Sequence, residues 1–348
     1  MLAIAAAYLG YKVAVLGPGG RESPAGHVAY WAHAWGSKGE VSHGLLEEFC
    51  QLVSVVLIEW ENVPLDLVRR IEAKGVPVRP GPKALSIAQD RLFEKQLAQT
   101  LNIPVPAFGL IDEHSHHQHI AATPCILKTR RDGYDGKGQV RIPAGDSIEE
   151  AWRSLGRVPC ILEEVVNFTC EISMIIARSP SASDDKMSFY GPFENKHVNG
   201  ILRQTSYPMS NPFVSYRSQY IRQAAYQAMR QLATALDVHG LLAVEFFVAR
   251  DGTILFNEMA PRPHNSGHLT IECCHTSQFE QYVRAACNLP LGSSDFHSRG
   301  DMINLIGEEA HKAAWYMENE TNTLHLYGKE EVKKGRKMGH VVQTCPWK

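Results

Sequence analysis

One segment restricts the fold more than any other, because it is typical of a tight β-hairpin with two apolar arms. Residues 241–261, LLAVEFFVARDGTILFNEMAP, place Asp251 and Gly252 between two runs rich in β-branched and aromatic residues. Asp-Gly is a strong short-range signal for a two-residue hairpin loop. A loop of those two residues sets three facing pairs in the arms: Phe247 with Phe256, Ala243 with Ala260, and Glu245 with Glu258.

The predicted pairing of Glu245 with Glu258 has an electrostatic consequence. Like charges directly opposite one another destabilise a sheet. Both arms are otherwise apolar, so the two carboxylates are costly unless one is protonated or a cation lies between them. Mg²⁺ takes one or two carboxylates and completes its shell with water and substrate phosphates. We therefore predict a Mg²⁺ site here, with Asn265 as a further oxygen ligand. The plainer alternatives are two rim residues that reach solvent, or a register displaced by one residue.

Helix and strand alternate over the first ninety or so residues. Helices are predicted over 2–9, 45–52 and 65–73, and strands over 13–16, 53–58 and 76–78. This alternation favours an α/β fold with a doubly wound parallel sheet. The chain opens on a helix, whereas such folds open on a strand followed by a glycine-rich turn.

The remainder of the chain mixes strands with two longer helices. Helices are predicted over 88–101 and 220–236, strands over 124–130, 160–166, 171–177 and 187–190, and a polar surface loop over 179–185. Residues 113–119, EHSHHQH, contain four histidines. No periodic strand or helix orients them, so we interpret the segment as a solvated loop rather than a metal site.

Composition excludes several classes of protein. The chain has 348 residues, enough for two or three domains, and its net charge of −2 gives no reason to expect a nucleic-acid partner. No apolar run approaches the roughly 20 residues of a membrane span. The apolar start lacks the basic region of a secretory signal. Eight scattered cysteines suit reduced thiols, so we expect a cytoplasmic enzyme with no membrane partner.

Residues 128–139, KTRRDGYDGKGQ, form a glycine-rich segment that follows a predicted strand. Glycines let backbone N–H groups approach phosphates, and Lys128 and Lys137 can neutralise their charge. The segment lacks the Gly-Lys-Ser/Thr of a Walker A motif, and a mobile surface loop is an equally good interpretation.

Two later segments also carry anion-binding chemistry. In RPHNSGH, residues 262–268, Arg262 can hold an anion and His264 can shuttle protons near the metal. The alternative for His264 is a structural role in its loop. KEEVKKGRKMGH, residues 329–340, gathers cations that can hold a substrate phosphate, or that form a solvated basic turn.

These segments together resemble the ATP-grasp enzymes, and among them the 5-(carboxyamino)imidazole ribonucleotide synthases of de novo purine synthesis. The resemblance is distributed over nearly the whole chain. The matching motifs, in order, are EWENVP, AQDRLFEK, KTRRDGYDGKGQ, LEEVVNFTCEIS, ENKHVNGIL, VEFFV, NEMAPRPHNSGH and GRKMGH.

The resemblance implies an architecture and a reaction. The architecture is a Rossmann-like N-terminal domain over 1–85, an α+β ATP-grasp domain over 86–285 and a small C-terminal domain over 286–348. In the implied reaction, ATP phosphorylates bicarbonate to carboxyphosphate. The exocyclic amine of aminoimidazole ribonucleotide then takes the carboxyl group, with release of ADP and phosphate. The implied cofactors are ATP and Mg²⁺, with Mn²⁺ as a possible substitute, and the implied assembly is a homodimer.

The resemblance also assigns roles to residues. The metal carboxylates fall on Glu245 and Glu258. Residues that resemble ATP contacts are Arg91 and Lys128 at the phosphates, Glu163 and the backbone near Val166 at adenine, and Glu171 at the ribose. Those that match positions around bicarbonate or carboxyphosphate are Tyr134, Gly136, Arg262 and His264. Lys329 and Arg336 resemble a clamp on the ribonucleotide phosphate, with Glu61 near its ribose.

Two departures from the family pattern stand at the N-terminus. The family begins with a strand and a GGGQLGR-like turn ahead of the position of Met1, which predicts a defect at the edge of the first sheet and in the ribonucleotide pocket. Leu16-Gly17-Pro18 also replaces an acidic residue that usually stands between leucine and proline. Two alternative functions follow: another purine-pathway ATP-grasp ligase, which ENKHVNGIL and GRKMGH disfavour, and a truncated paralogue that serves as an inactive binding module.

Overall fold

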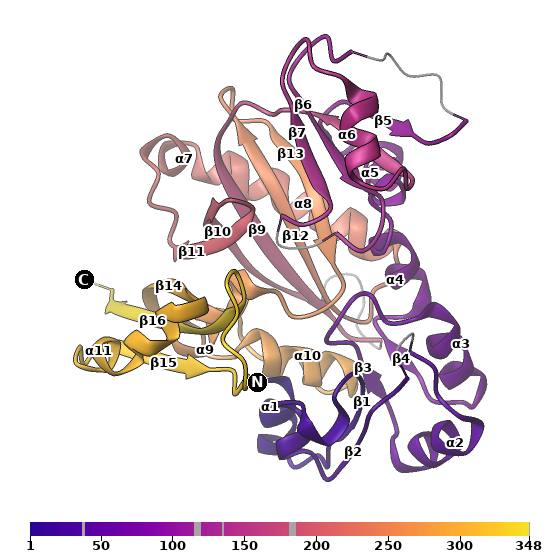
Figure 1. Cartoon of the computed structure of the whole chain (residues 1–348). Coiled ribbons are helices and arrows are strands. Elements are labelled where there is room, and N and C mark those ends of the chain that lie inside the picture. The colour runs from indigo at the N-terminus through magenta and orange to yellow at the C-terminus, as the bar shows by residue number, and fades with distance from the viewer. Residues whose placement is uncertain (37–38, 115–119, 134–135, 181–185, 348) are drawn as a thin grey trace.

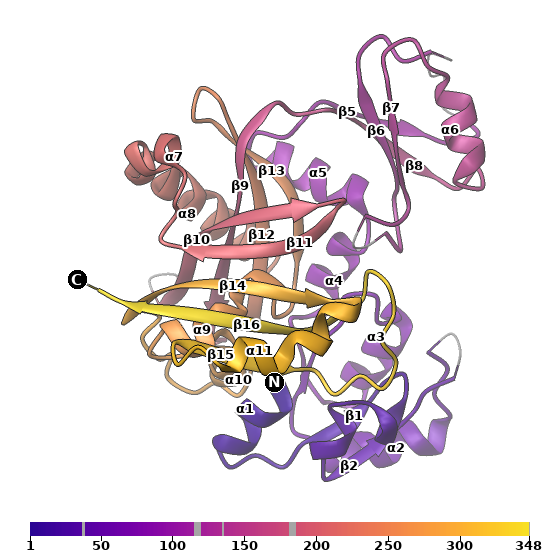
Figure 2. The same cartoon turned by 60° about the vertical axis from the view of Figure 1, so that its left-hand side comes forward.

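An antiparallel sheet of eight strands forms the centre of the molecule (Figures 1 and 2). The computed structural model describes residues 1–36, 39–114, 120–133, 136–180 and 186–347. In spatial order the strands are β13 (Ile254–Ala260), β12 (Gly240–Ala249), β9 (Phe168–Arg178), β10 (Met187–Val198), β11 (Ile201–Tyr207), β14 (Ser298–Ile306), β16 (Lys337–Pro346) and β15 (Asn322–Leu326). The C-terminal strands therefore extend the same sheet that holds the β12–β13 hairpin.

Helices cover both faces of this sheet, because the central strands are apolar on both sides. Alternate residues of β12 point to opposite faces. Leu242 and Val244 belong to a core cluster with α8 (Ser218–Ala235). Leu241 and Ala243 belong to a second cluster with α10 (Gln278–Ala286). The apolar residues at helical spacing in the helix predicted over 220–236 are buried: Ile221, Ala225, Ala228 and Leu232 in α8, and Leu236 just after it.

A smaller antiparallel sheet stands apart from the central one, at the upper right of Figure 2. Its strand order is β5 (Phe108–Ile111), β8 (Cys160–Glu164), β6 (Cys125–Thr129) and β7 (Gln139–Ile142), and α6 (Ile148–Ser154) packs on it. The helix predicted over 88–101 is α5 (Arg91–Thr100), which begins three residues later than predicted and follows a separate helix, α4 (Pro82–Ala88). The break has a local cause, since the Asp90 carboxylate caps α5 by accepting from the Leu92 N–H, 3.1 Å away.

The N-terminal residues form helices and short parallel strands, as the alternation predicted. The elements are α1 (Leu2–Tyr8), β1 (Ala14–Leu16), β2 (Trp31–His33), α2 (His43–Leu52), β3 (Val56–Leu57), α3 (Leu65–Ala73) and β4 (Val78–Arg79). The strands form two separate pairs, β1–β2 and β3–β4, instead of one sheet. A mainly apolar cavity of about 1200 Å³ is lined by residues 11–17 and 53–60 of both pairs. The cavity therefore lies between β1 and β3, and the predicted defect at the edge of the first sheet stays a prediction.

The predicted hairpin is present, with one difference that leaves the carboxylate pair in place. Its turn has three residues, since the Ala249 N–H donates to the Thr253 carbonyl at 2.9 Å. Phe247 consequently faces Leu255, not Phe256 as predicted. A bulge between Phe246 and Glu245, which leaves Asn257 unpaired, restores the register. Ala243 then faces Ala260, and Glu245 faces Glu258, both as predicted.

The remaining elements are short and lie in connections. They are α7 (Pro212–Tyr216), α9 (Thr270–Cys273), α11 (Ala313–Met317) and the 3₁₀ turns Gly20–Glu22, Gly26–Val28, Asn265–Leu269 and Gly307–Lys312. Among the described residues, no helix combines the length and the apolar character needed to cross a bilayer.

Candidate active site

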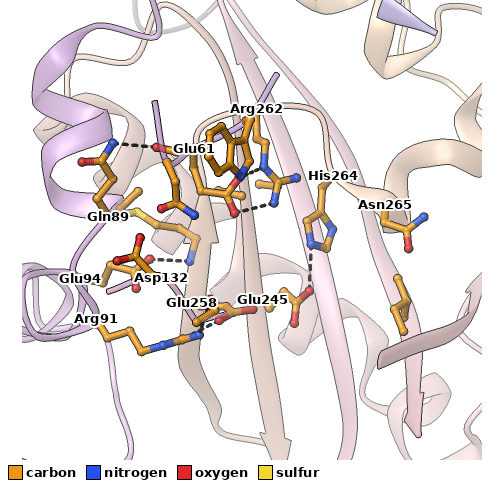
Figure 3. Close-up of a pocket in the computed structure, with 18 of the residues that line it drawn as sticks. Glu61, Gln89, Arg91, Glu94, Asp132, Glu245, Glu258, Arg262, His264 and Asn265 are labelled. Carbon is orange, nitrogen blue, oxygen red and sulfur yellow. Dashed lines mark hydrogen bonds and ion pairs between the residues drawn. The ribbon is translucent and has the colours of Figure 1, made fainter. Parts of the chain in front are cut away.

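A polar cavity of about 280 Å³ opens beside the paired glutamates (Figure 3). Its lining comes from the central sheet, from the connections after β3 and β6, and from α5, and this convergence makes it the candidate site. The lining residues with ionisable side chains are Glu59, Glu61, Arg91, Glu94, Arg130, Asp132, His197, Glu245, Glu258, Arg262, His264 and Lys337.

Glu258 is paired with a cation of the protein itself. Nη1 of Arg91, at the start of α5, lies 2.6 Å from Oε2 of Glu258 on β13. Burial alone would raise the pKa of Glu258, but the Arg91 guanidinium outweighs it and lowers that pKa to about 2. The carboxylate is therefore ionised and keeps part of its surface open, with 40% of the side chain exposed.

Glu245, across the hairpin, faces two histidines. It is buried, and its Oε1 lies 3.0 Å from Nε2 of His264. Nε2 of His197 lies 4.0 Å from the other oxygen. Burial opposes ionisation of Glu245, and the two histidines lower its pKa nonetheless.

His197 also joins Glu245 to the predicted ribose contact, Glu171. Its Nδ1 lies 2.5 Å from Oε2 of Glu171 on β9. Burial lowers the pKa of the imidazole, but Glu171 and Glu245 raise it to about 9. His197 is thus a cation at neutral pH.

The donor set fits a hard divalent cation. Glu245 and Glu258 offer carboxylate oxygens from facing positions, and Mg²⁺ prefers such oxygens. Asn257, in the adjoining bulge, has a buried Oδ1 that accepts no hydrogen bond from any residue within the described ranges. The Asn265 amide exchanges hydrogen bonds of 3.0 and 2.7 Å with Asn304, and Figure 3 shows it beyond His264 from Glu258. Its role as a metal ligand stays a prediction.

Two of the predicted ATP contacts meet in a buried ion cluster. Nζ of Lys128 on β6 lies 2.9 Å from Oε2 of Glu163 on β8, and Nζ of Lys95 lies 3.5 Å from the same oxygen. Burial lowers the pKa of Lys95 to about 8, against the attraction of Glu163. Val166 lies half-buried in the connection between β8 and β9. The nucleotide roles of these residues stay predictions.

The glycine-rich segment lies against the β10–β11 turn. Gly136 has a φ of +77°, and a Cβ there would lie 2.9 Å from the Asn199 carbonyl oxygen. Nη2 of Arg91 donates to the Gly133 carbonyl at 3.3 Å, which ties the same segment to the Glu258 pair. Tyr134, predicted near bicarbonate, lies outside the described residues, as do residues 115–119 of the histidine-rich segment.

Arg262 and Glu61, both predicted substrate contacts, bind one another. The guanidinium holds both carboxylate oxygens of Glu61, with Nη2 2.9 Å from Oε1. Gln89, at the end of α4, fixes the Glu61 backbone by donating to its carbonyl at 2.8 Å. This ion pair connects the N-terminal segment to the loop after the hairpin.

The two residues predicted as a phosphate clamp, Lys329 and Arg336, do not line the polar cavity. Lys329 donates to the Lys337 carbonyl at 2.6 Å, and Arg336 donates to the Glu331 carbonyl at 3.0 Å. Neither lines the polar cavity, whereas Lys337, next to Arg336, does. Lys329 lines the larger N-terminal cavity instead.

A second histidine cluster lies outside this cavity. Glu272, His325 and His340 bring possible metal-binding atoms within 4.8 Å of one another. The rings of His325 and His340 are stacked, with an interplanar angle of 19°. Lone pairs of near-parallel rings do not converge on one ion, so this cluster has the geometry of packing rather than of a metal centre.

The sequence analysis assigned no role to several residues of the cavity. His197 and Glu94, which line the cavity, stand in ENKHVNGIL and AQDRLFEK, segments noted only as motifs. Burial raises the pKa of Glu94 to about 8, and its Oε1 accepts from the Met259 N–H at 2.9 Å. The available signal was charge at positions that helical spacing places on the buried face of α5.

Comparisons with known proteins agree with this arrangement. Family models match for the ribonucleotide synthetase preATP-grasp domain over 1–89, the ATP-grasp domain over 96–279, and the phosphoribosylaminoimidazole carboxylase C-terminal domain over 301–346. The fold and the site thus define an ATP-grasp protein.

Individual relatives narrow the family. An N5-carboxyaminoimidazole ribonucleotide synthase of Brucella melitensis is 40% identical over 99% of this chain and 93% of its own length. The bifunctional purine synthesis protein purC/E of Dictyostelium discoideum is 38% identical, and the chain spans 36% of that longer protein. A solved N5-carboxyaminoimidazole ribonucleotide synthetase in complex with ADP has a TM-score of 0.86 at 35% identity, over 99% of this chain and 89% of that one. The chain belongs to the N5-carboxyaminoimidazole ribonucleotide synthase family.

Proposed function

We propose that the chain is a ligase that carboxylates aminoimidazole ribonucleotide with bicarbonate at the expense of ATP, in purine synthesis. The observation that carries this proposal is the facing pair Glu245–Glu258 in a cavity that also holds Arg91, Arg262 and Lys337. Two carboxylates surrounded by cations suit a reaction that moves a phosphoryl group between anions.

In this proposal, phosphoryl transfer takes place beside Glu258. Bicarbonate oxygen attacks the γ-phosphorus of ATP, the bond to the β-phosphate oxygen breaks, and carboxyphosphate and ADP form. Arg91, which is paired with Glu258 here, would bind the phosphates once a metal neutralises that carboxylate. Glu245 and Glu258 would hold Mg²⁺, or Mn²⁺ in its place, and the ion would neutralise charge on the transferred group.

In this proposal, carboxyl transfer takes place beside Arg262. The exocyclic amine attacks the carbonyl carbon of carboxyphosphate, phosphate leaves with the bonding electrons, and the amine loses a proton. Carboxyphosphate is short-lived in water, so the two reactants must be held together with solvent excluded. Arg262 lines the cavity and can bind the anionic intermediate. The glycine-rich segment at Gly136 is the candidate for a lid that excludes solvent from it.

The other predicted roles form part of this proposal. Lys128, Glu163, Val166 and Glu171 serve the nucleotide, and Glu61, Lys329 and Arg336 serve the ribonucleotide. A homodimer in the cytoplasm is the proposed form of the enzyme, from the resemblance noted above.

The test is ADP release from ATP and bicarbonate, measured with and without aminoimidazole ribonucleotide. We expect the ribonucleotide to stimulate ADP release and labelled bicarbonate to enter an acid-labile carbamate. Absence of stimulation in a chain shown by circular dichroism to be folded would refute the proposal. ADP release driven by a different purine intermediate would point to another ligase of the superfamily. Glu280→Gln, which removes a charge from an α10 ion pair outside the lining of the cavity, is the control for site variants.

A further inference from the structure

A line of buried hydrogen bonds runs from the central sheet to His264. It crosses three neighbouring strands before it reaches the loop after the hairpin. Its members, from the far end, are Thr205 on β11, Asn195 on β10, Ser173 on β9 and Ser266 in the 3₁₀ turn. Each is at most 4% exposed, so water does not compete for these bonds.

Successive donor–acceptor distances along the line are short. The Thr205 hydroxyl lies 3.0 Å from Oδ1 of Asn195, and Nδ2 of Asn195 lies 2.9 Å from Oγ of Ser173. Oγ of Ser173 lies 2.7 Å from Oγ of Ser266. Oγ of Ser266 lies 2.7 Å from Nδ1 of His264.

One contact fixes the direction of every bond. The backbone N–H of Ser266 points at Nδ1 of His264, 3.3 Å away, and a backbone N–H can only donate. Nδ1 must therefore carry a lone pair, and the nearby Ser266 hydroxyl must also donate to it. Ser266 Oγ then accepts from Ser173, which accepts in turn from the Asn195 amide. Thr205 donates to Asn195 Oδ1, so the assignment is consistent along the whole line.

We infer that this line of hydrogen bonds from Thr205 to Ser266, here called the relay, holds His264 as the Nε2–H tautomer. The ring then donates to Glu245 instead of taking the proton of the reacting amine. With Nδ1 occupied by Ser266, the proton of the neutral ring sits on Nε2. That atom lies 3.0 Å from Oε1 of Glu245. His264 therefore sets the orientation of a predicted metal carboxylate, while Ser266, Ser173 and Asn195 are positioning residues that act through it.

This inference rests on the proposed function for its catalytic meaning, but its structural content is testable without substrate. The probe is long-range ¹H–¹⁵N correlation on protein labelled with ¹⁵N-histidine, with His264→Gln to assign the signals. We expect a protonated Nε2 and an unprotonated Nδ1 for His264 in the wild-type chain. A protonated Nδ1 overturns the inference, whatever the protein's activity.

Variants test the relay itself. Ser266→Ala removes the hydroxyl donor, so we expect the two His264 nitrogen signals to move toward each other as both tautomers become populated. We also expect kcat to fall by roughly tenfold, the effect of one buried hydrogen bond. Ser173→Ala, one bond further away, should cause a smaller shift in the same direction. It also keeps the test available if Ser266→Ala does not fold.

The matched control is Ser188→Ala. Ser188 is a buried serine on β10 that does not line the cavity, and its hydroxyl accepts a hydrogen bond of 2.8 Å from the Gln281 amide. This variant should change neither the His264 signals nor kcat. Unchanged His264 signals in both relay variants would refute the positioning role. A wild-type spectrum as expected, together with inactive wild-type protein, would refute the proposed function and leave the tautomer assignment standing.

Discussion

Arg91 and Glu258, which are 167 residues apart in sequence, form an ion pair of 2.6 Å at the mouth of the cavity. The Arg91 side chain is 16% exposed and the Glu258 side chain 40%. The guanidinium thus occupies a carboxylate oxygen that the proposed metal site requires. If the proposed metal takes this oxygen, metal binding and release of Arg91 are two parts of one equilibrium.

Separate and joint removal of this pair should have different effects. Glu258→Gln leaves Arg91 without its counter-charge, so we expect a lower melting temperature and a loss of turnover of at least about 100-fold. The double variant Arg91→Met with Glu258→Gln removes both charges and should recover most of the melting temperature but none of the turnover. Thermal melts and ADP release measure the two effects. Recovery of turnover in the double variant would contradict the metal assignment.

The charge of His197 makes stability depend on pH in a defined window. Its folded pKa of about 9 is above the ordinary value of 6.5, so its stabilising effect is complete below 6.5 and is lost as pH rises through 9. We expect the melting temperature of the metal-free chain to fall between these values, and His197→Gln to flatten that fall. His43→Gln, at an exposed position of α2, is the control. An equal slope in wild type and His197→Gln would contradict the assigned pKa.

Gly136 should tolerate no side chain, for a reason beyond its backbone angle. Gly136→Ala combines a positive φ with a Cβ 2.9 Å from the Asn199 carbonyl oxygen, a strain of about 1–3 kcal/mol that displaces the segment from the β10–β11 turn. We expect kcat to fall with little change in melting temperature. Gly145→Ala, at a φ of +90° with open space around its Cβ, shares the backbone cost alone. Equal losses in the two variants would show that contact with the turn is unimportant.

Tyr282 joins α10 to the β3–β4 pair. Its hydroxyl accepts from the Ile58 N–H at 2.8 Å and lies 2.7 Å from the Arg79 carbonyl oxygen. Tyr282→Phe removes these bonds in a buried place, so we expect a loss of about 1–3 kcal/mol in the free energy of unfolding. Tyr220→Phe, on the exposed side of α8, should cost little. Denaturant titration of both variants measures the difference, and equal free energies would contradict the proposed link.

The sequence was sufficient to predict features that depend on local pattern. The burial of α8 follows from its spacing of apolar residues, and the Glu245–Glu258 pair follows from the parity of a hairpin. The side chains that pair with those two glutamates could not be predicted from local sequence pattern. Arg91 and His197 reach them from distant segments, and only the packing of α5 and β10 against the hairpin brings the charges together.

The N-terminal region shows the same limit. Helix α3 has the predicted bounds, since its amphipathic pattern is local. Strands β3 and β4 have only two residues each, because strand length is set by pairing with neighbours and the β3 edge toward β1 is unpaired among the described strands. Residues 53–58 have the apolar composition of a longer strand, and composition cannot report whether a partner is present.

The bulge at Asn257 has a consequence for how the hairpin tolerates insertions and deletions. Twelve residues separate Glu245 from Glu258, and the chain accommodates them as four facing pairs, a three-residue turn and one bulged residue. Five facing pairs and a two-residue turn without a bulge also accommodate twelve residues. Glu245 therefore faces Glu258 in either arrangement of the turn. Loss of one residue leaves eleven, which four facing pairs and a three-residue turn accommodate without a bulge, so deletion of Asn257 should keep Glu245 opposite Glu258. Because the turn and the bulge can each gain or lose a residue, the facing of the two carboxylates should depend on turn and bulge together, not on the length of either alone.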